Sequence, residues 1–196
     1  MINEGIPYRV YGGLRFFERA EIKDALAYLR LIASRHDDPS FERVVNVPTR
    51  GIGAKTVDAV RERAKSEKIS LWMAALKLIA SSELPARARD ALNIFLQLID
   101  RMARETAGLT LGEVAEHMLA GSGLIEHYKK EKGEKAESRV ENLEELINAA
   151  RGFEHDEAEG LDPLSSFLAH AALEAGEGQA EEWEDCVQLM LSLIHI

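Results

Sequence analysis

The sequence has few of the residues that stabilise small secreted folds or hold metal ions. It contains one cysteine, Cys186, in 196 residues. A single thiol excludes an intramolecular disulfide framework and a cysteine-rich zinc site, and it suits the reducing cytoplasm. Proline and glycine are also scarce, at 5 and 14 residues, and 46% of the chain is apolar. This composition excludes a disordered tail and is sufficient for a hydrophobic core.

Long apolar runs are absent as well. No segment approaches the roughly 20 consecutive apolar residues that cross a bilayer. Residues 1–13 have neither the basic region nor the long apolar region of a signal peptide. The sequence therefore predicts a soluble, cytoplasmic protein without a membrane partner.

Charge is distributed unevenly along the chain. Residues 1–110 carry 18 basic and 14 acidic side chains, a net charge of +4, whereas residues 111–196 carry 6 basic and 20 acidic side chains, a net charge of −14. The acidic part repels phosphate, so a polyanionic partner would have to meet residues 1–110. There the stretch 43–68 holds seven basic and three acidic residues. Taken alone, that stretch is typical of a solvated helix face with mixed charges.

Apolar residues recur three and four positions apart through most of the chain, which is the period of amphipathic helices. We expect helices at 18–34, 39–45, 54–66, 71–84, 86–106, 124–132, 138–152 and 163–174, and one that begins after Thr110. The predicted N-terminal caps are Asp38 before Pro39, Ser70, the Thr110–Glu113 capping box, and Asp162 before Pro163. Trp72 and Phe95 occupy core positions of such helices, so we expect them to pack rather than to stack on bases.

The two ends of the chain have a different pattern. Residues 7–11, PYRVY, favour a strand and are followed by two glycines, and residues 186–196 form a continuous apolar run. Two isolated strands beside a helical body are too few for a stable sheet. We therefore interpret the chain as mainly α, a helical body inserted into a larger domain of which only terminal strand fragments are present.

One segment carries most of the chemical information, and it lies between the helices expected at 39–45 and 54–66. It reads VPTRGIGAKTVDAV over residues 47–60. The hydrophobic residues around two closely spaced glycines are typical of a helix-hairpin-helix. Glycines permit backbone dihedrals closed to other residues and let the main chain approach another surface closely. The candidate DNA-contacting residues are Thr49, Arg50, Gly51, Ile52, Gly53, Lys55 and Thr56.

Each of these residues has an expected role at a phosphate backbone. Ile52 can plug the core and hold the hairpin, and the amides from Gly53 onward open a helix whose N-terminus favours an anion. Arg50, Lys55 and Thr56 can add side-chain contacts that position a nucleic acid without reading its sequence. The alternative is a tight turn in which the glycines only complete a cap.

The sequence offers no site for catalysis or metal binding. No GxxxxGK[ST] loop occurs, and the six histidines lack HExxH or HxH spacing. No Ser/His/Asp constellation or carboxylate pair can be argued. The residues therefore favour a binding module over an enzyme.

Four segments resemble one known family. They are IPYRVYGGLRFFERAEIKDALAYLRL (6–31), FERVVNVPTRGIG (41–53), EKGEK (131–135) with RVENLEEL (139–146), and FLAHAAL (167–173). These segments are similar to UvrD/PcrA/Rep-type superfamily 1 DNA helicases, and most of all to UvrD. The resemblance extends over nearly the whole chain. One departure is at the end, where residues 187–196 read VQLMLSLIHI and the family continues Val-x-Leu-Met-Thr-Leu-His.

The resemblance implies a division of the chain. Residues 20–178 would form the helical 2B subdomain with its GIG loop, and residues 1–19 and 179–196 would be fragments of the RecA-like domain 2A. The parent enzyme would be an ATP-dependent 3′-to-5′ helicase of DNA repair, in which 2B rotates and touches the duplex ahead of the fork.

The same resemblance implies partners and cofactors. The partners would be duplex DNA at a fork junction, the remaining helicase core domains and repair proteins. ATP and Mg²⁺ would serve the parent enzyme. We expect no cofactor in this chain and no ATP hydrolysis by it alone, because the nucleotide-binding motifs of the family do not occur in it.

Two other functions remain open from the residues. The acidic side chains of 111–185 can form a protein-interaction or autoinhibitory surface, with the GIG loop only a structural turn. A free-standing helix-hairpin-helix nuclease or glycosylase is the other, although no catalytic Lys/Asp pair follows the hairpin at a recognisable position. Salt-dependent DNA binding that is lost on changing Arg50 and Lys55 would distinguish a DNA-binding module from the interaction surface.

Overall fold

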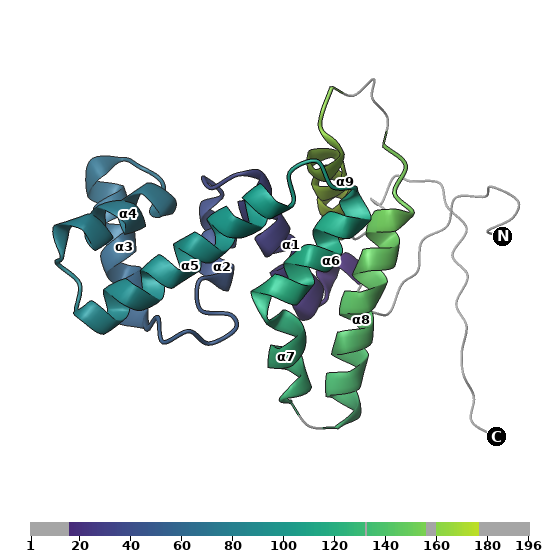
Figure 1. Ribbon diagram of the computed structural model, residues 1–196, viewed down its shortest axis with the longest axis horizontal. Helices are drawn as coiled ribbons and strands as arrows, with labels where there is room; N and C mark the ends of the chain where they lie inside the picture. The colour runs from purple at the N-terminus through teal and green to yellow at the C-terminus, as the bar shows by residue number, and fades with distance from the viewer. Residues whose placement is uncertain (1–15, 132, 156–159, 177–196) are drawn as a thin grey trace, which may run out of the picture.

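The computed structural model describes residues 16–131, 133–155 and 160–176, which form helices joined by turns (Figure 1). The elements are the 3-10 helix η2 (Phe16–Glu18) and the α-helices α1 (Ala20–Ala33), α2 (Asp38–Val44), α3 (Ala54–Glu67), α4 (Leu71–Ser81), α5 (Ala86–Glu105), α6 (Leu111–Ser122), α7 (Leu124–Lys129), α8 (Glu134–Arg151) and α9 (Pro163–Gly176). The described residues contain no strand, and the mainly α class is confirmed. The strands predicted at 7–11 and 186–196 lie outside the described residues.

Most helix boundaries follow the sequence pattern, but the helix expected at 71–84 ends at Ser81, and a boundary between two later helices also differs. The helix expected at 124–132 ends at Lys129, and the next begins at Glu134 rather than at 138. Gly133 separates them with a φ of +97°, a conformation that glycine adopts without strain. The break is therefore set by backbone geometry and not by apolar periodicity. Within the described ranges, no helix combines the length and apolarity that a membrane span requires.

Helix α1 lies at the centre of the molecule (Figure 1). It packs against α2 and α5 on one side and against α6, α8 and α9 on the other. Ten of its 14 residues are buried, as expected for a helix with apolar residues around most of its circumference. Helices α3 and α4 pack on each other at one end of the elongated molecule, and α5 connects that end to the group α6–α9 (Figure 1).

The aromatic core between α2, α4 and α5 confirms the packing role predicted for Trp72 and Phe95. Both side chains are buried, and each ring meets the ring of Phe41 edge to face, with centroids 6.5 and 5.6 Å from it. This geometry is the favoured one for aromatic pairs. The rings therefore contribute to the core and are not available as a surface for stacking bases.

Most predicted caps are present, and one is wrong. The Ser70 hydroxyl accepts from the Met73 amide at 3.4 Å, and the Thr110–Glu113 capping box is complete. Helix α2, however, is capped by Asp37, whose Oδ1 accepts from the Ser40 amide at 2.9 Å. Asp38 instead accepts from the amide of Leu71 at 2.8 Å. The amide of Leu71 is in the first turn of α4 and has no partner within that helix. Asp38 therefore caps α4 and not its own helix.

A buried carboxylate on α1, Asp24, links three helices. Its Oδ2 accepts a hydrogen bond from the Tyr128 hydroxyl at 2.5 Å, and its Oδ1 lies 2.7 Å from Nε of Arg43. Burial, reinforced by the hydrogen bond to Asp24, raises the pKa of Tyr128 above its ordinary value, so the hydroxyl keeps its proton. The pairing satisfies a charge that would otherwise be costly to bury.

A second buried carboxylate, Glu21, lies one turn earlier on α1. Its Oε1 accepts from Nδ2 of Asn142 at 2.7 Å, and Nε of Arg139 lies 3.7 Å from its Oε2. Arg19 in turn donates to Oδ1 of Asn142. The start of α1 is thereby joined to α8 through polar contacts as well as apolar packing.

Replacing Asp24 with alanine is expected to lower the free energy of unfolding by about 1–3 kcal/mol, because the buried Tyr128 hydroxyl loses its acceptor. Urea denaturation followed by circular dichroism measures this change. The control is Asp58→Ala, which removes an exposed carboxylate paired with Arg61 and should leave stability nearly unchanged. Equal losses in the two variants would contradict a stabilising role for the buried network.

Candidate functional site

The predicted hairpin includes the loop 46–53, which lies between α2 and α3, and the side chain of Asn46 holds the shape of this loop. Oδ1 of Asn46 accepts hydrogen bonds from the backbone amides of Arg50, at 2.8 Å, and Ile52, at 3.2 Å. Asparagine often bonds backbone groups of its own turn. That preference is the signal by which the sequence could have identified Asn46, which was not among the predicted site residues.

Tyr28 of α1 contacts the hairpin from the core of the protein. Its hydroxyl donates to the backbone oxygen of Val47 at 2.6 Å. Burial raises the pKa of Tyr28 to about 12, so the hydroxyl remains a donor at neutral pH. Nothing in the sequence pattern connects Tyr28 to the hairpin, because helical periodicity assigns it only to the core.

The two glycines of the hairpin differ in backbone conformation. Gly51 has a φ of +79°, in the left-handed region that favours glycine, as predicted. The same prediction is wrong for Gly53, whose φ of −81° and ψ of 168° are open to any residue. Gly53 is the N-cap of α3, and that position ordinarily has extended dihedrals. A Cβ placed on either glycine would meet no atom within 4 Å, so both present open backbone.

The remaining predicted residues divide between the surface and the interior. Ile52 is 1% exposed and fills the core, which confirms its expected role as a plug. Thr56 is also buried, so its side chain points away from the surface of the hairpin. Thr49 and Lys55 are exposed, and Lys55 has no acidic partner among the described residues. The exposed members of the predicted set are therefore Thr49, Gly51 and Gly53 in the loop and Lys55 in the first turn of α3.

Arg50 does not project from this loop. Its guanidinium donates to the backbone oxygens of Val44, Pro48 and Ser122 at 3.4, 3.0 and 2.9 Å. The half-buried side chain also lies over the ring of Tyr28, with 5.7 Å between the guanidinium carbon and the ring centroid. The sequence could not show this, since Ser122 is 72 positions away.

Three of the seven basic residues in the stretch 43–68, Arg43, Arg61 and Arg63, are paired with acidic residues. Arg61 bonds Glu42 at 2.5 Å and Asp58 at 2.9 Å, and Arg63 bonds Glu83 at 2.6 Å. These pairs lower the pKa of the Glu42 and Glu83 carboxyls, each chiefly through the hydrogen bond from its arginine. The mixed-charge face expected for this stretch is thus present on α3.

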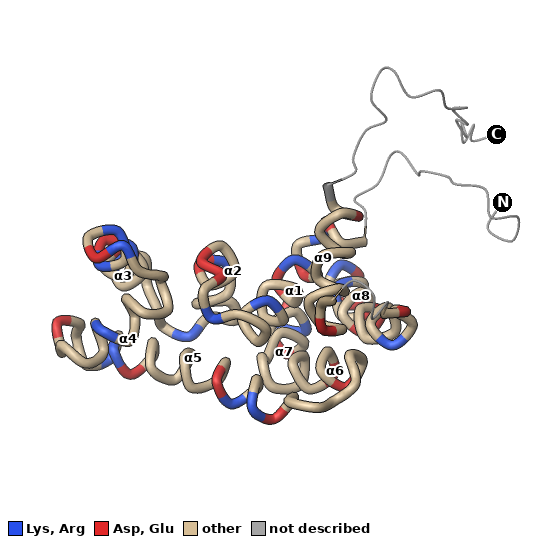
Figure 2. Tube along the Cα trace, turned by 90° about the horizontal axis from the view of Figure 1, so that it is seen from above, with Lys and Arg blue, Asp and Glu red and all other residues tan. Residues whose placement is uncertain are grey.

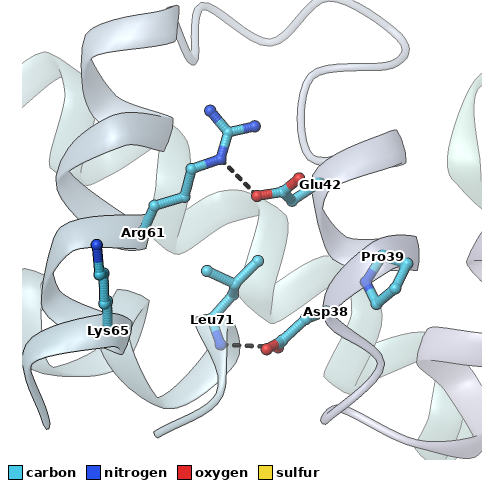
Figure 3. Close-up of a pocket in the computed structure, with 6 residues that line it drawn as sticks. All are labelled: Asp38, Pro39, Glu42, Arg61, Lys65 and Leu71. Carbon is cyan, nitrogen blue, oxygen red and sulfur yellow. Dashed lines mark hydrogen bonds and ion pairs between the residues drawn. The ribbon is translucent and has the colours of Figure 1, made fainter. Parts of the chain in front are cut away.

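A shallow pocket of about 460 Å³ opens between α2, α3 and α4 beside this face (Figure 3). Arg61 reaches across it to Glu42, and Asp38 bonds the Leu71 amide at its floor (Figure 3). Since these polar groups already have partners, the pocket offers a ligand little beyond Lys65. No cluster of side chains able to hold a metal occurs in the part of the chain that the structure describes.

Comparison with known proteins identifies the family to which this sequence is similar. Residues 1–195 match a family described as UvrD-like helicase C-terminal domain. DNA helicase II of Escherichia coli (strain K12) is 54% identical over 191 residues, 97% of this chain and 26% of that protein. ATP-dependent DNA helicase PcrA of Bacillus subtilis (strain 168) is 34% identical over 185 residues, 94% of this chain and 25% of that protein. The chain spans about a quarter of the length of these curated relatives.

The two glycines should respond differently to substitution. Gly51→Ala is expected to lower the free energy of unfolding by about 1–2 kcal/mol, because an L side chain is strained at its left-handed φ. Gly53→Ala should cost less, under about 1 kcal/mol, because its backbone is ordinary and the added Cβ meets open space, so that only the poorer capping by alanine destabilises the helix. Urea denaturation of both variants measures the difference, and equal losses would contradict the backbone assignment.

Proposed function

The chain belongs to the UvrD-like helicase C-terminal domain family, and from this premise we propose that it contains the 2B subdomain of an ATP-dependent 3′-to-5′ helicase of DNA repair. In this proposal residues 20–178 are the subdomain, and residues 1–19 and 179–196 belong to the RecA-like domain 2A. The helical body of α1–α9 supports the assignment of the subdomain. The relatives named DNA helicase II and ATP-dependent DNA helicase PcrA support the enzyme class.

The role proposed for this part of the protein is contact with duplex DNA through a helix-hairpin-helix-like loop. The observation that carries it is the open backbone at Gly51 and Gly53, where no side chain stands between the main chain and a partner. Because a phosphate backbone can come close only to such a surface, the glycines suit contact with either strand of a duplex.

The start of α3 provides the groups that an anion needs. The amides of Ala54 and Lys55 are in the first helical turn, and no hydrogen bond to another described residue uses them. Such amides, together with the helix dipole, favour a negatively charged group. The exposed ammonium of Lys55 adds a positive charge at the same place. These groups can hold a phosphate without distinguishing one base pair from another.

The charge distribution limits the strength of this contact. Basic and acidic residues alternate along α3 instead of separating into a basic face (Figure 2). Residues 111–196, with a net charge of −14, oppose the approach of the rest of the polyanion. One hairpin reaches only a few phosphates, so we expect a Kd on the order of 10⁻⁴ M for this chain, at the weak end of non-specific binding.

ATP and Mg²⁺ are assigned in this proposal to the longer protein, since the sequence has no phosphate-cradling GxxxxGK[ST] loop. The partners are duplex DNA at a fork junction, the remaining helicase core domains and repair proteins. The hairpin would hold the duplex while those domains act on the strand. No residue of this chain is assigned a catalytic role.

Lys55→Ala is expected to lower the slope of log affinity against log salt by about 1, because one phosphate contact is lost. Titration of the full chain with a short duplex DNA at several salt concentrations, followed by NMR, measures slope and location together. The control is Lys77→Ala. It removes the same charge from a lysine of α4 that is paired with Glu67, the last residue of α3. Shifts confined to 129–160, with 48–58 silent, would contradict the hairpin assignment and favour a protein-interaction role.

Gly53→Ala tests close approach separately from charge. It should abolish measurable binding while leaving the fold intact, because the added methyl group stands between the backbone and the phosphate. The matched control is Gly152→Ala, another glycine with an ordinary φ of −87°, at the end of α8. Unchanged affinity in the folded Gly53→Ala protein would exclude backbone contact at this position.

A further inference from the structure

Arg50 is the predicted contact residue whose surroundings fit that role least. It lies in the hairpin beside the open backbone, yet its guanidinium is directed toward the interior of the protein. We propose that Arg50 is a positioning residue that ties the hairpin to the end of α6, and that it acts on duplex binding through the hairpin backbone and not by contacting phosphate. This inference rests on the DNA-contacting function proposed for the hairpin.

The three acceptors explain why a cation is held there. Val44 is the last residue of α2, and Ser122 is the last residue of α6. Carbonyl groups at the end of a helix have no partner within it and carry partial negative charge. Arg50 donates to both ends through its two terminal nitrogens, and also to Pro48 within the hairpin. One side chain thus donates hydrogen bonds to the ends of two helices and to the hairpin loop.

Two aromatic rings hold the guanidinium in place. Its central carbon lies 5.7 Å from the centroid of Tyr28 and 5.6 Å from that of Phe95, within the range of cation–π attraction. Both rings are buried in the core, on helices α1 and α5, so the guanidinium is held against residues outside the loop. To reach a phosphate, Arg50 would have to leave the rings and three carbonyls at once.

The main chain of Arg50 is engaged as well. Its amide donates to Asn46, so that backbone and side chain are anchored in different directions. Pro48 of the hairpin also lies close to Gly123, between α6 and α7, because a Cβ placed on Gly123 would lie 3.6 Å from its side chain. The hairpin therefore lies against the turn between α6 and α7, and Arg50 connects the two by its hydrogen bond to Ser122. A loop held in its binding conformation avoids the ordering cost of association.

The test compares Arg50→Ala, Arg50→Lys and Lys55→Ala in the full chain, titrated with the same short duplex DNA at several salt concentrations. If Arg50 positions the hairpin, both Arg50 variants should weaken binding about fivefold with the salt slope unchanged, because lysine keeps the charge but cannot bridge three carbonyls. If Arg50 binds phosphate, alanine should lower the slope by about 1 and lysine should restore it. The second pattern would overturn the proposal.

Circular dichroism of each variant separates positioning from a general loss of stability. Folded Arg50 variants that bind DNA as well as the unsubstituted chain would show a purely structural role, which also overturns the proposal. A variant-free measurement is available through the NMR signals of the Arg50 guanidinium. They should stay in place when the duplex saturates the protein, whereas a phosphate ligand would shift them. If the unsubstituted chain shows no salt-dependent binding, the proposed function itself fails, and this outcome differs from the failure of the Arg50 assignment alone.

Discussion

The need to pair two buried carboxylates on a central helix is the constraint on which the arrangement of the other helices depends. Glu21 and Asp24 are almost completely covered because α1 is packed on nearly all sides. A buried charge is tolerated only when it is paired and hydrogen-bonded. The partners come from three other helices: Arg43 from α2, Tyr128 from α7, and Asn142 and Arg139 from α8. These polar pairs connect α1 to α2, α7 and α8, in addition to the apolar packing of α1 on α2 and α8.

The same helix also determines the conformation of the hairpin. Tyr28 lies one turn after Asp24 on α1 and bonds Val47, and its ring supports Arg50. The loop that we propose to contact DNA is thus built on α1, the helix with the largest share of buried residues in the described part of the chain. A surface loop fixed in this way can present backbone amides in a single orientation, which suits recognition of a phosphate chain by geometry. The exposed part of the site is small because most of its residues serve to hold it.

Formal charge is a poor guide to the partner here. Arg61 and Arg63 belong to the basic stretch, Lys77 lies on α4, which packs on α3, and each of the three is paired with a carboxylate. What distinguishes the hairpin is the combination of open backbone at two glycines with the unpaired start of α3. The family to which the chain belongs gives this combination a functional context, since its relatives are named DNA helicases. The predicted DNA contact therefore depends on local backbone geometry more than on net charge.

The sequence by itself determined the features that depend on residues a few positions apart. The apolar stripe of α5, the Ser70 cap, the Thr110–Glu113 box and the position of Ile52 all follow from helical period, capping chemistry and spacing. Tertiary structure decided the partners of Asp38 and Arg50, which lie 33 and 72 positions away, and it decided that Thr56 faces inward. A polar side chain can bond its own turn or an unpaired group on another helix. Only the packing of the whole protein brings one of those groups within reach, and for this reason a local pattern could locate the hairpin but not the residues that hold it.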